Sequence, residues 1–485
     1  MGSRRLPEGW LQLEWVFGYN GHTARNNVKV TNEGHLLYYV AGVGVLHDTF
    51  RRKQTFYTGH NNDITSLAVT GDGTTAATGQ VGKDAYITVW DASTCAALSV
   101  IRDGHTHRVS TLAFSTDMKL LASVGGPDHK QELMVWEWRK GRRLACNVAY
   151  SGKVEEVEWE PGSAARLVTC GHNHVKFWKL SGNVLQGRSG VFGGEATSDQ
   201  LSMTHLPDDR LVTGTATGHL YVWQKGKVTS AIKDVHPGGV LVTEMYPGGL
   251  LTGGRDGTIT LFDKQLNKVA IVPEAPSLVY EIAGPIHSLA VFNEKIIVGT
   301  EKNEVWTVRV EHDGGLGVAC VVQGHGLGEL WGLATHPTRP LAITASDDCT
   351  VRLWDLEERR PLATAMVERA ARAAAFSPNG QHVAVGLMQG MFVVLQAEHL
   401  EEQCRVCDRK EVRHDLKYSP SGAFLAVASN DNFVDIYQVG SSYQRLHVLQ
   451  GASSFIMHLD WSSDNVYIQL NSGASERLIY HVSSQ

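Results

Sequence analysis

One unit recurs along this chain, and it limits the possible folds more than any other feature. Its clearest copy, at 324–355, opens with Gly-His and closes with Trp-Asp, and further copies lie at 59–91 and 104–136. A unit of this length cannot bury both faces of its own sheet, so neighbouring units must stack to form a core. We therefore expect a repeat protein whose core is shared between successive units.

The position of Trp354 can be followed through the whole sequence, and we call it the marker position. It recurs every 39 to 46 residues, at His47, Trp90, Trp136, Trp178, Trp223, Phe262, Val308, Trp354, Val394, Tyr437 and Tyr480. Short apolar runs bounded by turn residues, as at 120–125 and 383–386, indicate strands. The unit resembles a WD40 repeat, which forms one four-stranded blade, and eleven such units predict an all-β chain of tandem WD40 β-propellers.

Seven blades is the commonest closure of a WD40 ring, and counting from His47 places seven units before residue 310. We expect a hydrophobic motif and the first blade at 11–50, the rest of a seven-bladed propeller at 51–310, and a second propeller at 311–485. The second propeller shows only four units and is incomplete. A closed ring needs roughly 80–130 more residues at this period, so either the chain is truncated or the second propeller is an open arc.

Composition excludes several classes of protein. The formal net charge is −6 with no basic stripe, which argues against a nucleic-acid partner. Seven scattered cysteines do not indicate a secreted disulfide framework. No apolar run approaches the roughly 18 residues of a membrane span, and no signal core follows the first methionine. We expect a cytoplasmic protein without a membrane partner.

Residues 11–19 combine five large apolar side chains in strict alternation: Leu11, Leu13, Trp15, Phe17 and Tyr19. Alternation predicts that they share one face of a strand. Burial of such side chains stabilises by about 1.5–3 kcal/mol each, and exposed patches of that size are rare. The pattern favours a structural role, closing a blade or lying between the propellers.

This segment, followed by Arg25-Asn26-Asn27, resembles the hydrophobic motif (HELP motif) of the echinoderm microtubule-associated-protein-like (EMAP-like) family. Segments 78–82, 329–337 and 458–462 are also similar to that family, so the resemblance covers essentially the whole chain in order. It implies a non-catalytic scaffold that binds tubulin or microtubule-bound proteins, on cytoplasmic microtubules or in a ciliary axoneme. The chain departs from many members by lacking an amino-terminal basic region and a coiled coil, so self-trimerisation is not expected.

The resemblance to WD40 repeats also implies which polar residues are structural. In that family the Gly-His histidine, a Ser or Thr, an Asp and the Trp form a hydrogen-bonded cluster. The best set here is His325, Ser346 or Thr344, Asp348 and Trp354. Because buried polar groups need partners, we expect the same role for His60 with Trp90 and for His105 with Trp136.

Two basic clusters are the candidate partner-binding residues: Arg51, Arg52 and Lys53, and Arg139, Lys140, Arg142 and Arg143. Both are expected just after the last strand of a blade, where connections reach the surface. Solvated loops account for most such clusters. The functional alternative is salt-sensitive attraction to the acidic surface of tubulin.

No catalytic, cofactor or metal site is predicted. Cys404 and Cys407 have CxxC spacing, with His399 and His414 nearby, but no second pair follows to complete a zinc site. Nucleophile-elbow, phosphate-loop and metalloprotease motifs are lacking. Two alternatives stay open, since fold alone does not decide function: a general adaptor, such as a signalling protein or ubiquitin-ligase substrate receptor, and an enzyme that uses the central channel.

Overall fold

The computed structural model describes residues 12–272, 284–310 and 316–482. It divides into two compact units, Met1–Gly324 and His325–Gln485. Strands account for 59% of the described residues, which contain no α-helix, only short 3₁₀ turns such as η1 (Trp138–Lys140), η2 (Met388–Gly390) and η3 (Val439–Ser441). Among those residues no helix could cross a bilayer. The predicted all-β fold class is confirmed.

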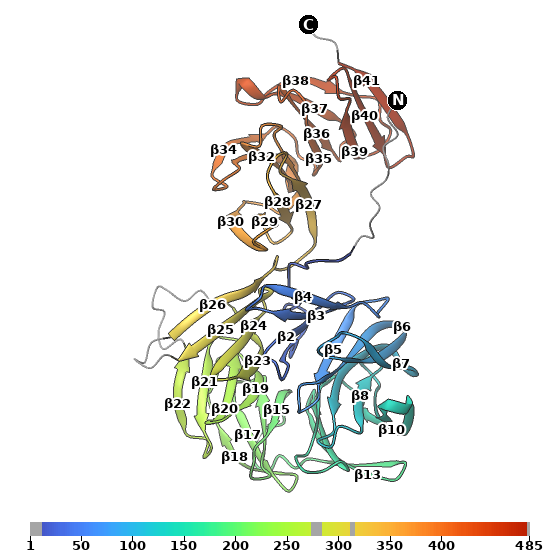
Figure 1. Cartoon of the computed structure of the whole chain (residues 1–485), viewed down its shortest axis with the longest axis vertical. Coiled ribbons are helices and arrows are strands. Elements are labelled where there is room, and N and C mark those ends of the chain that lie inside the picture. Colours follow the sequence, from blue (N-terminus) through green and yellow to red (C-terminus); the bar gives the residue numbers. More distant parts are fainter. Residues whose placement is uncertain (1–11, 273–283, 311–315, 483–485) are drawn as a thin grey trace. The chain divides into compact units, whose positions relative to one another are not determined.

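Unit 1 begins with three blades (Figure 1). Blade 1 contains β1 (Val28–Val30), β2 (Leu36–Val40), β3 (Val43–Asp48) and β4 (Lys53–Tyr57). Blades 2 and 3 merge into one six-stranded sheet made of β5 (Ile64–Val69), β6 (Thr75–Asp91), β7 (Ala97–Phe114), β8 (Leu121–Gly125), β9 (Gln131–Glu137) and β10 (Arg142–Tyr150). In this sheet β6 folds back on itself, because Thr78 and Thr88 meet side by side and the N–H of Ala92 donates to Thr74 O. It therefore supplies two strands of blade 2, and β7 completes blade 2 before starting blade 3.

Four regular four-stranded blades complete unit 1. Blade 4 contains β11 (Val154–Trp159), β12 (Arg166–Gly171), β13 (His174–Ser181) and β14 (Val184–Ser189). Blade 5 contains β15 (Gln200–His205), β16 (Leu211–Thr215), β17 (Leu220–Gln224) and β18 (Lys227–Ile232). Blade 6 contains β19 (Val240–Tyr246), β20 (Gly249–Gly254), β21 (Ile259–Asp263) and β22 (Lys268–Val272), and blade 7 contains β23 (Ile286–Phe292), β24 (Lys295–Thr300), β25 (Glu304–Val310) and β26 (Leu316–Gln323).

The seven blades of unit 1 form a closed ring. First strands contact the first strand of the next blade from β5 through β7, β11, β15 and β19 to β23, β23 contacts β1, and β2 of blade 1 contacts β5 of blade 2. Because every blade is an antiparallel meander, the turns after its first and third strands lie on one face of the ring, which we call the A face. The turns after its second and fourth strands lie on the opposite B face. The seven-bladed first propeller is thus confirmed.

Unit 2 contains four sheets in a row. Blade 8 contains β27 (Leu330–Thr335), β28 (Leu341–Ser346), β29 (Thr350–Asp355) and β30 (Arg360–Met366), and blade 9 contains β31 (Ala371–Phe376), β32 (His382–Leu387), β33 (Met391–Gln396) and β34 (Glu402–Cys407). Blade 10 contains β35 (Arg413–Tyr418), β36 (Phe424–Ser429), β37 (Val434–Gln438) and β38 (Gln444–Leu449), and blade 11 contains β39 (Ile456–Trp461), β40 (Tyr467–Ser472) and β41 (Arg477–His481). First strands β27, β31, β35 and β39 contact one another in that order.

All eleven marker residues lie on the third strand of their blade. The core is shared between blades, since Trp90 of blade 2 packs in one cluster with Leu37 and Tyr57 of blade 1 and stacks on the Tyr57 ring at 5.0 Å. Each tryptophan at a marker position also donates its Nε1–H to a Ser or Thr hydroxyl, over 2.6–3.0 Å. The repeat period therefore reflects one side chain that packs apolar surface between blades while a hydroxyl on the same blade satisfies its only polar atom.

Candidate interaction surfaces

The hydrophobic motif is not a strand, so that part of the sequence-based prediction is wrong. Residues 12–27, which we call the clasp, run without a β-ladder partner, and Leu11 lies outside the described residues. A side chain replaces the ladder: the Val16 N–H donates to Gln54 Oε1 at 2.9 Å, and Gln54 Nε2 donates to Val16 O at 3.2 Å. Leu13 is 45% exposed, whereas Tyr19 is 2% exposed. The alternating residues are therefore unequal in burial.

The clasp joins blade 1 to blade 7 and so closes the ring. The Tyr19 hydroxyl is hydrogen-bonded to Ser288 Oγ at 3.0 Å, and Ser288 Oγ also accepts the N–H of Asn27 at 2.9 Å. On the blade 1 side, Asn27 Oδ1 accepts the Tyr39 N–H at 3.0 Å and Asn27 Nδ2 donates to Tyr39 O at 3.1 Å. Asn27 is fully buried. Its side-chain amide bonds both the N–H and the C=O of Tyr39, as a neighbouring strand would, and so links the clasp to β2.

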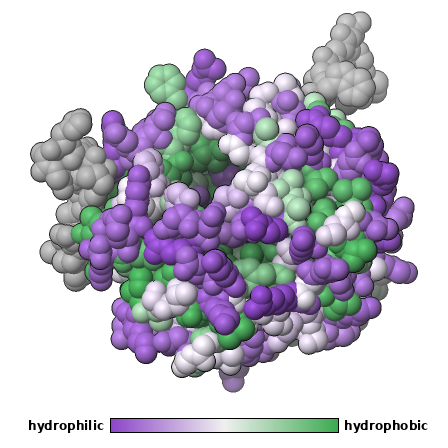
Figure 2. Space-filling view, turned by 90° about the horizontal axis from the view of Figure 1, so that it is seen from below, coloured by the Kyte–Doolittle hydropathy of each residue, from purple (hydrophilic) through white to green (hydrophobic). Residues whose placement is uncertain are grey.

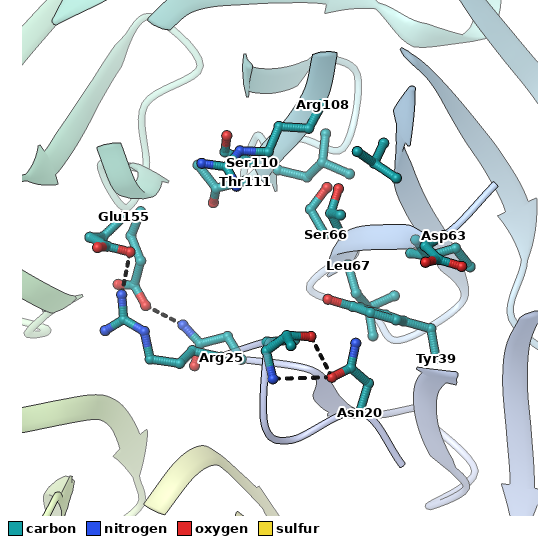
Figure 3. A pocket seen from close by; sticks show the side chains of 18 of the residues that line it. Asn20, Arg25, Tyr39, Asp63, Ser66, Leu67, Arg108, Ser110, Thr111 and Glu155 are labelled. Carbon is teal, nitrogen blue, oxygen red and sulfur yellow. Dashed lines mark hydrogen bonds and ion pairs between the residues drawn. The ribbon is translucent and has the colours of Figure 1, made fainter. Parts of the chain in front are cut away.

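The clasp then crosses the central channel. Arg25 is paired with Glu155 of β11 and also donates to Leu201 O at 2.9 Å and Leu241 O at 3.4 Å. Figure 3 shows Arg25 and Glu155 joined at one side of the cavity that they line together with Asn20. One arginine therefore links the first strands of blades 4, 5 and 6 to the segment that closes blades 1 and 7.

Gly21 is fixed by close approach. A Cβ at this position would lie 2.0 Å from Thr300 O of blade 7. Asn303 of the same blade accepts the N–H groups of Gly21 and His22, both at 2.8 Å. Any larger residue would push the clasp away from blade 7.

Blade 8 contains the hydrogen-bonded cluster that the WD40 resemblance implies. His325 lies 3.1 Å from Asp348 through Nδ1 and 2.7 Å from Thr344 Oγ1 through Nε2. Trp354 donates to the same Thr344 oxygen at 2.6 Å. Ser346, the other candidate, instead donates to Glu329 O.

His60 and His105 are in related but simpler clusters. His60 is hydrogen-bonded to Thr78 at 2.8 Å and to Gln80 at 2.9 Å, so an amide occupies the place of the acid. His105 is hydrogen-bonded to Ser123 at 2.7 Å, and its buried Nδ1 has no hydrogen-bond partner among the described residues. Burial lowers the pKa of His105 to about 4. Both histidine side chains are therefore hydrogen-bonded to other residues of the propeller, as expected for a structural role.

A fourth cluster was missed in the sequence. His236 of blade 6 is fully buried, 3.1 Å from Asp256 and 2.8 Å from Thr252. The signal was present: Asp256 and Thr252 precede Phe262 by the same six and ten residues that separate Asp348 and Thr344 from Trp354. A phenylalanine at the marker position and His-Pro in place of Gly-His hid it.

The two basic clusters lie on third-to-fourth-strand turns, not after the last strand of a blade as expected. Arg51 and Arg52 lie in the β3–β4 turn and Lys53 begins β4, while Arg139 and Lys140 lie in η1 between β9 and β10, which begins with Arg142 and Arg143. The repeat read from the sequence ends on the third strand of a blade. The fourth strand of that blade therefore follows each Trp-Asp pair. Both turns accordingly lie on the A face, on blades 1 and 3.

Several of these cations already have a partner close to their own turn. Glu137 accepts Lys140 at 2.5 Å and Arg142 at 2.7 Å, and the Arg139 guanidinium lies 4.3 Å from the centre of the Trp138 ring. Arg51 is 77% exposed and 3.8 Å from Asp48. Lys53 and Arg143 form no ion pair with any residue that the structure describes. The net positive charge available to a partner is smaller than the sequence suggests.

The cysteines form neither a disulfide nor a metal centre in the described ranges. Cys404 and Cys407 lie on β34, where side chains three residues apart point to opposite faces.

The surface seen in Figure 2 is mainly hydrophilic, with hydrophobic residues in separate smaller patches.

The closed ring, the marker tryptophans and their Thr and His partners define a protein of the WD40 β-propeller class with two tandem propeller units. Models of the echinoderm microtubule-associated protein first beta-propeller and second beta-propeller match residues 53–308 and 330–485, and the HELP motif matches residues 6–45. The chain belongs to the echinoderm microtubule-associated protein family.

Individual relatives are similar over nearly the whole chain. The 77 kDa echinoderm microtubule-associated protein of Strongylocentrotus purpuratus is 34% identical over 99% of this chain and 71% of its own length. Echinoderm microtubule-associated protein-like 2 of Mus musculus is 36% identical over 98% of this chain and 75% of its own length. Echinoderm microtubule-associated protein-like 1 of Mus musculus is 35% identical over 99% and 60%.

Proposed function

We propose that this protein is a non-catalytic scaffold that binds microtubules, and that the basic turns of blades 1 and 3 contribute the contact. Membership of a family whose relatives are named as microtubule-associated supports the general role. The described residues contain no group of three or more potential metal ligands, and the histidines of blades 2, 3, 6 and 8 are engaged in intrablade hydrogen bonds. Binding accounts for the described features without a chemical step.

The observation that carries the proposal is the shared face of the two basic turns. Arg51 and Lys53 on blade 1 and Arg143 on blade 3 are exposed. Their charges attract an acidic polymer, and salt weakens attraction between exposed charges, since the screening length is only about 8 Å at physiological ionic strength. Tubulin is acidic, so we expect salt-sensitive binding with the A face toward the microtubule.

Co-sedimentation with stabilised microtubules tests this proposal. The intact protein should pellet at about 0.05 M salt and less at about 0.2 M. Arg51→Glu with Lys53→Glu should reduce pelleting several-fold. Lys83→Glu with Lys130→Glu reverses the same number of charges on B-face turns and should change it little.

Failure of the intact protein to pellet at low salt would overturn the microtubule role. Equal losses in the two double variants would keep the role and reject the A face. Localisation before and after microtubule depolymerisation separates a cytoskeletal protein from a general adaptor, which would keep its distribution.

A further inference from the structure

The central channel of unit 1 contains a chamber that the proposed microtubule contact does not use. It is a cavity of about 710 Å³ lined by residues from β1, β5, β7, β11, β15, β19 and β23, the first strands of all seven blades. The turns at Thr31–Asn32 and Thr70–Gly73 also line it, so it opens toward the A face.

The clasp bounds this chamber on the B-face side. Asn26 lines both this chamber and the neighbouring cavity shown in Figure 3. Its side chain donates to Glu156 Oε1, while Glu156 Oε2 accepts the Met203 N–H at 2.7 Å. Glu156 is therefore engaged by the protein itself.

The chamber has an excess of negative charge on one wall. Glu156 and Glu158 lie on β11, His205 on β15 and Glu244 on β19, which belong to three successive blades. Lys29 on β1 is the one lysine or arginine in the lining, and it forms no ion pair with the residues that the structure describes. Burial raises the pKa of Glu156 to about 7 and raises the pKa of Glu244. The cations of Arg25 and Lys29 offset part of the rise for Glu156, and Lys29 offsets part of the rise for Glu244.

Two buried polar atoms of the same wall have unused hydrogen-bonding capacity. The His205 side chain is only 4% exposed, and its Nδ1 lies 3.2 Å from Glu158 Oε2. Neither atom makes a hydrogen bond within the described part of the chain, although buried polar atoms normally do. Glu158 Oε2 faces His205 Nδ1, whereas the Glu158 side chain as a whole is 36% exposed, so a donor that enters from the A face meets the remaining exposed part of this carboxylate.

We propose that the chamber binds an arginine side chain presented by a partner polypeptide, with Glu158 and Glu244 as its anionic partners. A guanidinium has five N–H donors in a planar fork and can bridge carboxylates from two strands. Met245, a partly buried residue of the lining, offers an apolar contact to its methylene stem. No three ligand side chains in the described residues are placed to hold a metal ion, which favours an organic cation.

This site would select a partner different from tubulin, because an acidic surface is repelled by the same carboxylates. The basic turns lie on the outer part of the A face, on blades 1 and 3, whereas the chamber lies at the centre of the ring. A basic segment of a second protein can therefore bind while the outer turns contact an acidic polymer.

Saturation-transfer NMR with three capped tripeptides tests the proposal on the intact protein. Acetyl-Gly-Arg-Gly-amide should bind saturably. The citrulline analogue, which keeps the shape but lacks the charge, should bind at least about tenfold more weakly, because it cannot form charge-assisted hydrogen bonds with the carboxylates. The lysine analogue should fall between them.

Glu158→Gln with Glu244→Gln should abolish the preference for arginine over citrulline, and Glu294→Gln, an exposed A-face carboxylate outside the lining, should leave it intact. Equal binding of the arginine and citrulline peptides, or no arginine binding, would overturn the proposal even if the double variant fails to fold. The double variant should pellet with microtubules as the unmodified protein does, whereas Arg51→Glu with Lys53→Glu should keep peptide binding. The two proposals can thus fail separately.

Discussion

Blades 8 and 10 tie the third strand to the loop before the first strand with different chemistry. In blade 8, Trp354 donates to Thr344, which is bonded to His325, and His325 contacts Asp348. In blade 10 the marker residue is Tyr437. Its hydroxyl donates to Asp408 at 2.8 Å, and the fully buried Arg413 joins Asp408 at 2.6 Å to Asp435 at 2.9 Å.

The difference shows that the fold requires a polar link, which we call the tie, between the third strand and the loop before the first strand. It does not require one particular set of residues. In blade 8 a single hydroxyl, that of Thr344, bonds both His325 and Trp354. Blade 10 instead links its segments through a fully buried ion pair, Arg413–Asp435, and Arg409 adds a bidentate pair to Asp435 with both contacts at 2.7 Å. Buried charges are costly to leave alone, so the two blades should respond very differently to loss of one member.

The largest expected effect is loss of Asp435. Asp435→Ala removes a fully buried carboxylate and leaves Arg413 buried without its main partner, which costs about 3–5 kcal/mol. Urea unfolding should show the loss, and hydrogen exchange should localise it to peptides from β35–β38. Asp460→Ala, an exposed aspartate of blade 11, is the matched control and should change stability by less than about 0.5 kcal/mol. A loss for Asp435→Ala as small as the control's would mean that blade 10 does not depend on its ionic tie.

Blade 3 should lose stability at a higher pH than blade 10 as the solution is acidified. In blade 3, His105 has no acid partner, and burial and the nearby Arg143 lower its pKa to about 4. Its unfolded value is about 6.5, so its contribution is complete above that pH and is lost as pH falls toward 4, by up to about 3 kcal/mol. Burial raises the pKa of Asp435, but hydrogen bonds from Arg409 and Arg413 more than offset it and hold the pKa below its usual range. Its contribution is complete above the unfolded pKa near 3.9 and is lost only as pH falls further.

Exchange protection measured from pH 7 to 4, corrected for intrinsic rates, checks this order. Peptides from β7–β9 should lose protection first, and those from β35–β38 should keep it to pH 4. His105→Gln should remove the mild-acid loss in blade 3. Simultaneous loss in both regions would contradict the assignment of the two pH windows.

The fold could be predicted from the sequence because its determinants repeat locally. The marker position is set by packing between adjacent blades, and Gly-His, a hydroxyl residue and Trp-Asp recur at similar spacing in units 59–91, 104–136 and 324–355. The position of the basic turns within their blades was predicted wrongly. The sequence repeat begins with the fourth strand of the preceding blade, so each marker residue ends the repeat but lies on the third strand of its blade.

The rest could not be predicted because it depends on contacts between distant segments. Asp408, Arg409, Arg413 and Asp435 resemble ordinary surface charge in the sequence, and only the meander of blade 10 brings them together in its interior. Residues 12–19 alternate like a strand, but their ladder partner is the side chain of Gln54, 38 positions away from Val16. Likewise nothing local shows that Glu158 and Glu244 face one channel.

The smallest expected effect is in blade 2. There the histidine of the cluster has a neutral partner, Gln80, whereas the histidine of blade 8 has a charged one, Asp348. Gln80 accepts or donates a single hydrogen bond to His60 and also donates to Asn61 at 2.8 Å. Gln80→Ala removes these two neutral hydrogen bonds and should therefore cost about 1–2 kcal/mol. Asp348→Ala in blade 8 removes contacts to His325, to the Gly326 N–H at 2.7 Å and to the Thr350 N–H at 2.8 Å. It should cost clearly more, about 2–3 kcal/mol, because each contact is made to a charged group. Urea unfolding of the two variants side by side gives the difference, and equal losses would show that the charge of Asp348 adds nothing to the tie, leaving the hydroxyl and the tryptophan as its only stabilising members.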